Sequence, residues 1–60
     1  MTIELYELNT HTPLEAIKGI TAVTLETITT EIQILNYRDA EGKLRGREID
    51  NSRLGVYITE

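Results

Sequence analysis

The segment ITAVTLETITTEIQILNY, residues 20–37, decides the fold class of this chain. Apolar residues spaced by three and four positions, as on one face of a helix, are Leu25, Ile28, Ile32 and Leu35. Threonine, isoleucine and valine dominate the segment, however, and these β-branched side chains favour a pleated strand over a helix. We therefore predict two strands, over residues 20–26 and 28–37, with a break or bulge near Thr27 where the apolar phase changes. A helix remains the alternative for this segment.

The residues before this segment predict one strand and one short helix. Residues 2–8 at first alternate apolar and polar side chains, as a half-buried strand does. The sequence Thr12-Pro13-Leu14-Glu15 matches a capping box, in which Thr12 caps a helix and Glu15 reaches back to the cap. Gly19 can end the helix in the left-handed conformation. We predict a helix over residues 13–18, which is too short to be stable without tertiary packing.

The C-terminal part of the chain predicts two more strands joined by turns. In Asp39-Ala40-Glu41-Gly42, the aspartate can accept hydrogen bonds from the turn backbone and the glycine can adopt positive φ. Strands are expected over residues 43–49 and 53–59. Gly46 and Gly55 fall inside these strands, where glycine indicates strong curvature or a tight contact with a partner chain, and we favour curvature.

These elements together predict a mainly β fold in one domain, residues 1–60. The expected architecture is a small curled antiparallel meander or barrel of four to five strands, with the helix at 13–18 closing one end. An α+β arrangement is the alternative. A domain of this size buries only about 60% of the surface that its unfolded chain exposes, so its core is marginal and self-association would enlarge it.

The composition argues against catalysis and against cofactor binding. The chain has no Cys, a single His and no motif of catalytic groups. The lack of Cys excludes disulfides and thiolate metal sites, and His11 has no second histidine with which to bind a metal ion. We expect His11 to be a surface residue, the protein not to be an enzyme, and no metal or cofactor to be required.

Charge and hydropathy argue against a membrane span and against bulk affinity for nucleic acid. The formal net charge is −4, and no apolar run approaches the roughly 20 residues of a membrane-spanning helix. The chain does not open with the charged and apolar regions of a signal peptide, so we expect a cytoplasmic protein. Positive charge is concentrated late in the sequence, at Arg38, Lys43, Arg45, Arg47 and Arg53.

Four of these basic residues and one tyrosine are the candidate partner-binding residues. Lys43, Arg45 and Arg47 alternate along the 43–49 strand and should project from one face, with Arg38 across the hairpin. Such a stripe can contact phosphates or the carboxylates of a partner, or it can be an ordinary solvated face. We expect Tyr57 to be exposed, because the opposite face of its strand carries Leu54, Val56 and Ile58.

Two classes of function are compatible with these features. The first is a non-enzymatic protein-interaction module, such as an inhibitor, adaptor or small assembly subunit, that binds another protein. The alternative is a small β-barrel that binds RNA or single-stranded DNA through the basic residues Arg38, Lys43, Arg45 and Arg47, although interleaved aromatic residues are missing. We also expect a homo-oligomer, most simply a dimer, with Leu54, Val56 and Ile58 in the contact.

Overall fold

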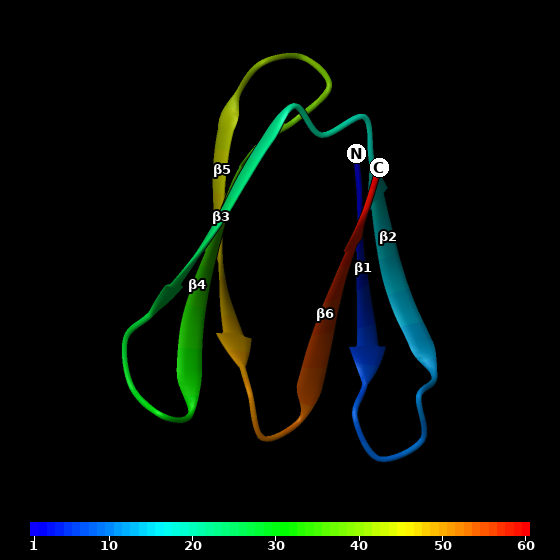
Figure 1. Ribbon diagram of the computed structural model, residues 1–60, viewed down its shortest axis with the longest axis vertical. Coiled ribbons are helices and arrows are strands. Elements are labelled where there is room, and N and C mark those ends of the chain that lie inside the picture. The colour runs from blue at the N-terminus through cyan, green and yellow to red at the C-terminus, as the bar shows by residue number, and fades with distance from the viewer.

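The computed structural model describes the whole chain, residues 1–60, as six β-strands without a helix. The strands are β1 (Thr2–Glu7), β2 (Pro13–Lys18), β3 (Ala22–Thr27), β4 (Ile32–Arg38), β5 (Leu44–Asp50) and β6 (Leu54–Thr59). They form two three-stranded antiparallel sheets, β2-β1-β6 and β3-β4-β5, which we call the terminal sheet and the central sheet. The two sheets lie face to face (Figure 1). No helix is present that could span a membrane.

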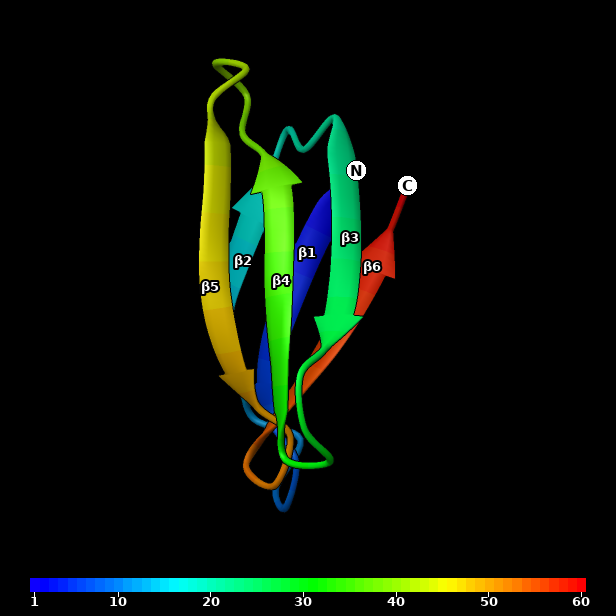
Figure 2. The same cartoon turned by 90° about the vertical axis from the view of Figure 1, so that its left-hand side faces the viewer.

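Each strand of the central sheet lies over one strand of the terminal sheet. Figure 2 shows β5 in front of β2, β4 in front of β1, and β3 in front of β6. The edge strands of the sandwich therefore come in two stacked pairs. We call these the β2/β5 side and the β3/β6 side.

Alternation along the strands fills the space between the sheets. Ile3 and Leu5 are two residues apart and lie on one face of β1, as Leu35 and Tyr37 do on β4. The buried core consists of Ile3, Leu5, Ile20, Leu35, Tyr37 and Ile49. Buried residues are only seven of 60, so most side chains on the edge strands remain in contact with solvent.

The two ends of the chain are held together by the terminal sheet. β6 pairs antiparallel with β1, with Thr2 opposite Thr59 and Glu7 opposite Leu54. The termini consequently lie close to each other (Figure 1). The Met1 ammonium group donates to the Ile20 carbonyl at 3.1 Å, and the Ile20 N–H donates to the Met1 carbonyl at 2.9 Å. These bonds fix the connection from β2 to β3 against the start of the chain.

The helix predicted over residues 13–18 is wrong. This segment is β2, in which Ile17 pairs with Ile3 of β1. Glu15 does not close a capping box but binds Arg47 of β5. Gly19 adopts positive φ, at 77°, after the end of a strand rather than of a helix. A helix of six residues would leave most of its terminal backbone groups unpaired, whereas pairing with β1 supplies partners for them.

The expected mainly β class is confirmed, but the predicted architecture is not. The chain forms six strands in two sheets instead of a meander or barrel of four to five strands, and neither sheet closes on itself. The absence of a helix also excludes the α+β alternative and the helical interpretation of residues 20–37. The break expected near Thr27 is a full reversal of the chain over residues 28–31. Within it, the Thr29 hydroxyl accepts hydrogen bonds from the N–H groups of Glu31 and Ile32, both at 3.1 Å.

The turn predicted at residues 39–42 is confirmed. Gly42 has positive φ, at 83°, and its N–H donates to the Asp39 carbonyl at 3.0 Å. Asp39 Oδ1 accepts from the N–H groups of Glu41 and Lys43, both at 2.9 Å. The carboxylate thus organises the turn in the way that the sequence suggested.

Candidate interaction surfaces

A hollow with two tyrosines at its edge lies on the outer face of the terminal sheet. Glu4 and Tyr6 alternate with the buried Ile3 and Leu5 and therefore point away from the core. Across the β1–β6 ladder, Glu4 is opposite Tyr57 and Tyr6 is opposite Gly55. A Cβ atom on Gly55 would overlap the Tyr6 ring. Gly55 is thus the residue that lets Tyr6 lie over β6, and close approach, not the favoured curvature, explains this glycine.

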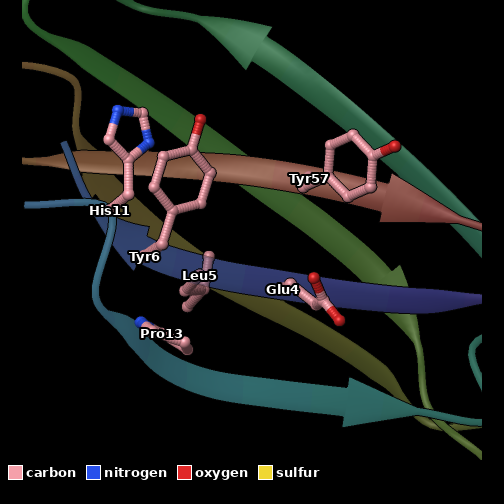
Figure 3. A pocket seen from close by; sticks show the side chains of 6 residues that line it. All are labelled: Glu4, Leu5, Tyr6, His11, Pro13 and Tyr57. Atoms are coloured by element: carbon pink, nitrogen blue, oxygen red, sulfur yellow. The ribbon is translucent and has the colours of Figure 1, made fainter.

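The loop between β1 and β2 completes the hollow. The His11 ring stacks on the Tyr6 ring with 5.8 Å between centroids and an angle of 11° between planes. His11 has positive φ, at 58°, which turns its side chain back toward β1. The hollow has a volume of about 270 Å³ and is lined by Glu4, Leu5, Tyr6, His11, Pro13 and Tyr57 (Figure 3). Aromatic faces beside a carboxylate are suited to hold a cationic group.

A second hollow continues the first across β2. Its volume is about 300 Å³, and its lining residues are Glu4, Pro13, Leu14, Glu15 and Ala16. Glu4 and Pro13 line both hollows, so the two form one shallow depression along the outer face and edge of the terminal sheet. Leu14 (55% exposed) and Tyr57 (58% exposed) are large apolar groups at its two ends. The exposure of Tyr57 is predictable from the alternation along its strand, whereas the placement of Glu4, Tyr6 and Leu14 at these hollows is not.

Arg45 and Arg47 share one face of β5, as their alternation predicts, whereas Arg38 starts from the other face of the central sheet. Arg45 is opposite Tyr37 and Arg47 is opposite Leu35 in the β4–β5 ladder, so both arginines start from the inner face of β5, at its edge. Arg38 is opposite Leu44 and lies on the outer face. Its Nη1 donates to the Gly42 carbonyl at 3.0 Å. Lys43 precedes the strand and makes no ion pair.

Both inward arginines are already neutralised by carboxylates. Arg47 Nη1 and Nη2 donate to Glu15 Oε1 and Oε2 at 2.7 and 3.2 Å. This hydrogen bonding lowers the pKa of Glu15 and raises the pKa of Arg47. Arg45 Nε donates to Asp39 Oδ2 at 3.1 Å. The pKa of Asp39 is lowered, first by the backbone N–H of Lys43 and then by the Arg45 side chain.

The direction of the backbone groups along β6 follows from two hydrogen bonds of β1. The Leu8 N–H donates to the Arg53 carbonyl at 3.0 Å, toward β6, and the Glu7 N–H donates to the Thr12 carbonyl at 2.9 Å, toward β2. Along an antiparallel strand, the N–H and C=O groups of successive residues point alternately toward the two neighbouring strands. The residues of β6 that bond to β1 are therefore Gly55, Tyr57 and Thr59. The N–H and C=O groups that point away from the sheet belong to Leu54, Val56 and Ile58, the residues predicted to mediate self-association.

No group of three or more His, Asp or Glu side chains is placed to hold a metal ion. Comparison with protein-family models, with curated proteins and with solved structures finds no match for this chain. The surfaces described above are therefore the observations from which a function can be argued.

Proposed function

We propose that this chain is a non-enzymatic protein-interaction module that binds a basic segment of another protein in the hollow beside Tyr6 and Tyr57. The observation that carries the proposal is the placement of the Glu4 carboxylate directly across from Tyr57, on the same face as Tyr6. A Lys or Arg side chain in this hollow would meet a carboxylate and the faces of aromatic rings together. Aromatic side chains on a rigid strand also contribute contact area at little entropic cost.

The charge distribution supports a cationic partner. Residues 1–37, which include every lining residue of the hollow except Tyr57, carry five Glu and one Lys, a net charge of −4. Glu15 is compensated by Arg47, but Glu4 has no ion pair. An uncompensated carboxylate in an acidic region attracts positively charged groups and raises their association rate.

The same geometry argues against the alternative, which is RNA or single-stranded DNA binding. Two of the four basic residues concerned, Arg45 and Arg47, are paired with carboxylates, and a third, Arg38, is hydrogen-bonded to Gly42 on the other face. Phosphate groups would have to compete with these internal partners. The rings of Tyr6 and Tyr57 lie on the terminal sheet and Tyr37 is buried, whereas these four basic residues lie on and beside the central sheet, which does not favour a surface that combines base stacking with phosphate contacts.

Titration of the isotopically labelled protein with two probes tests the proposal. The probes are a short peptide rich in lysine and arginine and a thymidine oligonucleotide of similar length, followed by the shifts of the amide signals. We expect the peptide to move the signals of Glu4, Tyr6 and Tyr57, and the oligonucleotide to move none. Oligonucleotide shifts at Lys43, Arg45 and Arg47 would instead support the alternative.

Matched variants separate a site from bulk charge attraction. Glu4→Gln and Glu41→Gln remove the same charge, but Glu41 lies in the hairpin turn of the central sheet, away from the hollow. We expect Glu4→Gln and Tyr57→Ala each to weaken peptide binding about fivefold to tenfold, and Glu41→Gln to leave it nearly unchanged. Equal weakening by the two Gln variants would show that the peptide responds only to net charge, and the proposal would fail.

A further inference from the structure

The β3/β6 side of the sandwich has two strand edges whose hydrogen-bonding groups are unpaired. The Thr21 N–H donates to the Arg38 carbonyl at 3.2 Å, and the Ile28 N–H donates to the Ile32 carbonyl at 3.0 Å. The even-numbered residues of β4 therefore direct their backbone hydrogen-bonding groups toward β3. In the β3–β4 ladder, Val23 is opposite Tyr37 and Leu25 is opposite Leu35. Val23 and Leu25 therefore direct their N–H and C=O groups away from the sheet, as Val56 and Ile58 do on β6.

The side chains of these same residues are apolar and partly exposed. Val23, Leu25, Val56 and Ile58 all lie on inner faces, since each is in register with a core residue of the neighbouring strand. Leu25 is nevertheless 43% exposed and Ile58 38% exposed, because no strand lies beyond them. On this side, backbone hydrogen-bonding groups are thus unpaired and apolar side chains of the inner faces remain partly exposed.

The opposite side of the sandwich is protected. There, the Glu15–Arg47 ion pair connects the edges of the two sheets. By the same alternation, the outward backbone groups belong to residues that include Lys18 on β2 and Glu48 and Asp50 on β5. Charged residues on an edge strand discourage pairing with another chain. The sequence of β6, LGVYIT, has no charged residue at all.

We infer that a second copy of this chain covers the β3/β6 side, with β6 of one copy antiparallel to β6 of the other. Strand β6 is complementary to itself under a twofold axis through Val56. This axis places Val56 opposite Val56 of the second copy, and Leu54 opposite Ile58 of the second copy. The outward N–H groups of Leu54, Val56 and Ile58 in one copy then face the outward C=O groups of these residues in the other. A shift of the register by one residue would set outward groups against groups already bonded to β1.

The self-complementarity of β6 and the small core favour a second copy over an unrelated strand. Each copy has a net charge of −4, and pairing along β6, which has no charged residue, keeps like charges out of the paired strands. The accessible surface is 4278 Å², against about 4,000 Å² for a typical monomer of this mass. The pairing would make the inner faces of two terminal sheets continuous. Because β3 lies over β6 (Figure 2), it would also bring β3 of both copies to the junction. The contact would extend a core in which only Ile3, Leu35 and Ile49 are fully buried.

The mass in solution, measured by light scattering or sedimentation, tests the inference. We expect the unmodified chain to reach twice its 6.8 kDa mass at high micromolar concentration. Ile58→Lys places a charge on the inner face at the junction and should reduce the mass to that of the monomer. Leu44→Lys introduces the same charge at a more exposed residue, on the outer face of the central sheet, and should leave the dimer intact. A monomeric mass of the unmodified chain would overturn the inference and leave the β3/β6 side to a different protein. Equal loss of the dimer in both lysine variants would overturn it as well.

A backbone change keeps the test decisive if Ile58→Lys fails to fold. A chain of 60 residues can be synthesised with an N-methyl group on Val56, whose N–H makes no bond within the monomer. We expect this chain to fold and to remain monomeric. The matched control carries the N-methyl group on Gly46, whose N–H points outward on β5, and should dimerise normally. A dimer that survives methylation of Val56 would contradict the inferred pairing. The test does not involve the hollow of the terminal sheet, so its failure would not affect the proposed function.

Discussion

Glu15 and Arg47 are 32 residues apart in the chain and join the two sheets through hydrogen bonds of 2.7 and 3.2 Å. Each starts from the inner face of an edge strand, Glu15 from β2 and Arg47 from β5. The pair closes the β2/β5 side of the sandwich, where aliphatic residues would otherwise be needed. The β3/β6 side has no such pair, which makes the two sides of the molecule unequal.

The Glu15–Arg47 pair should contribute modestly to stability. Both side chains are over one third exposed, and ion pairs of this kind contribute less than about 1 kcal/mol. We expect Glu15→Gln and Arg47→Gln each to destabilise by about 0.5 kcal/mol, and the double variant to be less destabilised than the sum of the two. Urea unfolding of the four proteins measures this coupling. Strict additivity would show that the pair does not stabilise the fold.

The carboxylates with lowered pKa predict a loss of stability in acid. Arg47 lowers the pKa of Glu15 from its ordinary 4.5, Ser52 lowers that of Asp50 and Lys43 that of Asp39 from 3.8. The unfolded chain therefore binds more protons than the folded one, and stability rises with pH across this range. The contribution is fully present above the ordinary values and is lost as the pH falls through the lowered ones.

Thermal unfolding between about pH 6 and about pH 2 should accordingly show a falling melting temperature. The slope should be shallower for Glu15→Gln, which removes one of the three groups, than for Glu26→Gln, whose carboxylate makes no hydrogen bond or ion pair. Identical slopes in the two variants would be inconsistent with a lowered pKa at Glu15.

Gly55 should tolerate no side chain as long as Tyr6 is present. An added Cβ would overlap the Tyr6 ring, so Gly55→Ala must displace the ring from β6. Because this ring lies on the outer face, its displacement should cost less than overpacking in a core. We expect a destabilisation of about 1 kcal/mol, and a smaller effect when Tyr6→Ala is also present. Gly46→Ala is the control, because its Cβ would meet only the Asn36 side-chain oxygen, at 3.1 Å. If Gly55→Ala has the same melting temperature as the unmodified protein, the described position of Tyr6 is refuted.

Gly42 should be required for its backbone conformation alone. Its φ is 83°, and nothing lies within 4 Å of an added Cβ, so no steric contact complicates the substitution. We expect Gly42→Ala to cost about 1 kcal/mol of unfolding free energy. Gly42→Asn, which accepts positive φ more readily, should cost less. The prediction fails if the two variants are equally stable or if alanine stabilises the protein.

Local chemistry made part of this fold predictable. β-Branched residues indicated strands in residues 20–37, and Asp39 and Gly42 indicated the turn that they form. The helix at 13–18 was predicted from an equally local signal, but here pairing of Ile17 with Ile3 overrides the capping pattern. A propensity of a few tenths of a kcal/mol per residue does not outweigh a complete strand ladder.

Contacts between distant parts of the chain account for the rest. The pairing of β6 with β1 joins the two ends of the sequence, and no local feature of either segment indicates the strand with which it pairs. The Glu15–Arg47 pair arises only after the sheets are stacked. The hollow depends on Tyr6 lying over Gly55, for which the one sequence signal was a glycine inside a strand.

Amide hydrogen exchange along β6 tests most directly that the β3/β6 side is an unpaired edge completed by a second copy. In dilute solution we expect slow exchange at Gly55, Tyr57 and Thr59, which bond to β1, and fast exchange at Val56 and Ile58. At high micromolar concentration the exchange of Val56 and Ile58 should slow in parallel with dimer formation, while Gly46 on the charged edge of β5 stays fast. Fast exchange of Val56 and Ile58 at every concentration, or slow exchange of Val56 in the dilute monomer, would contradict the account.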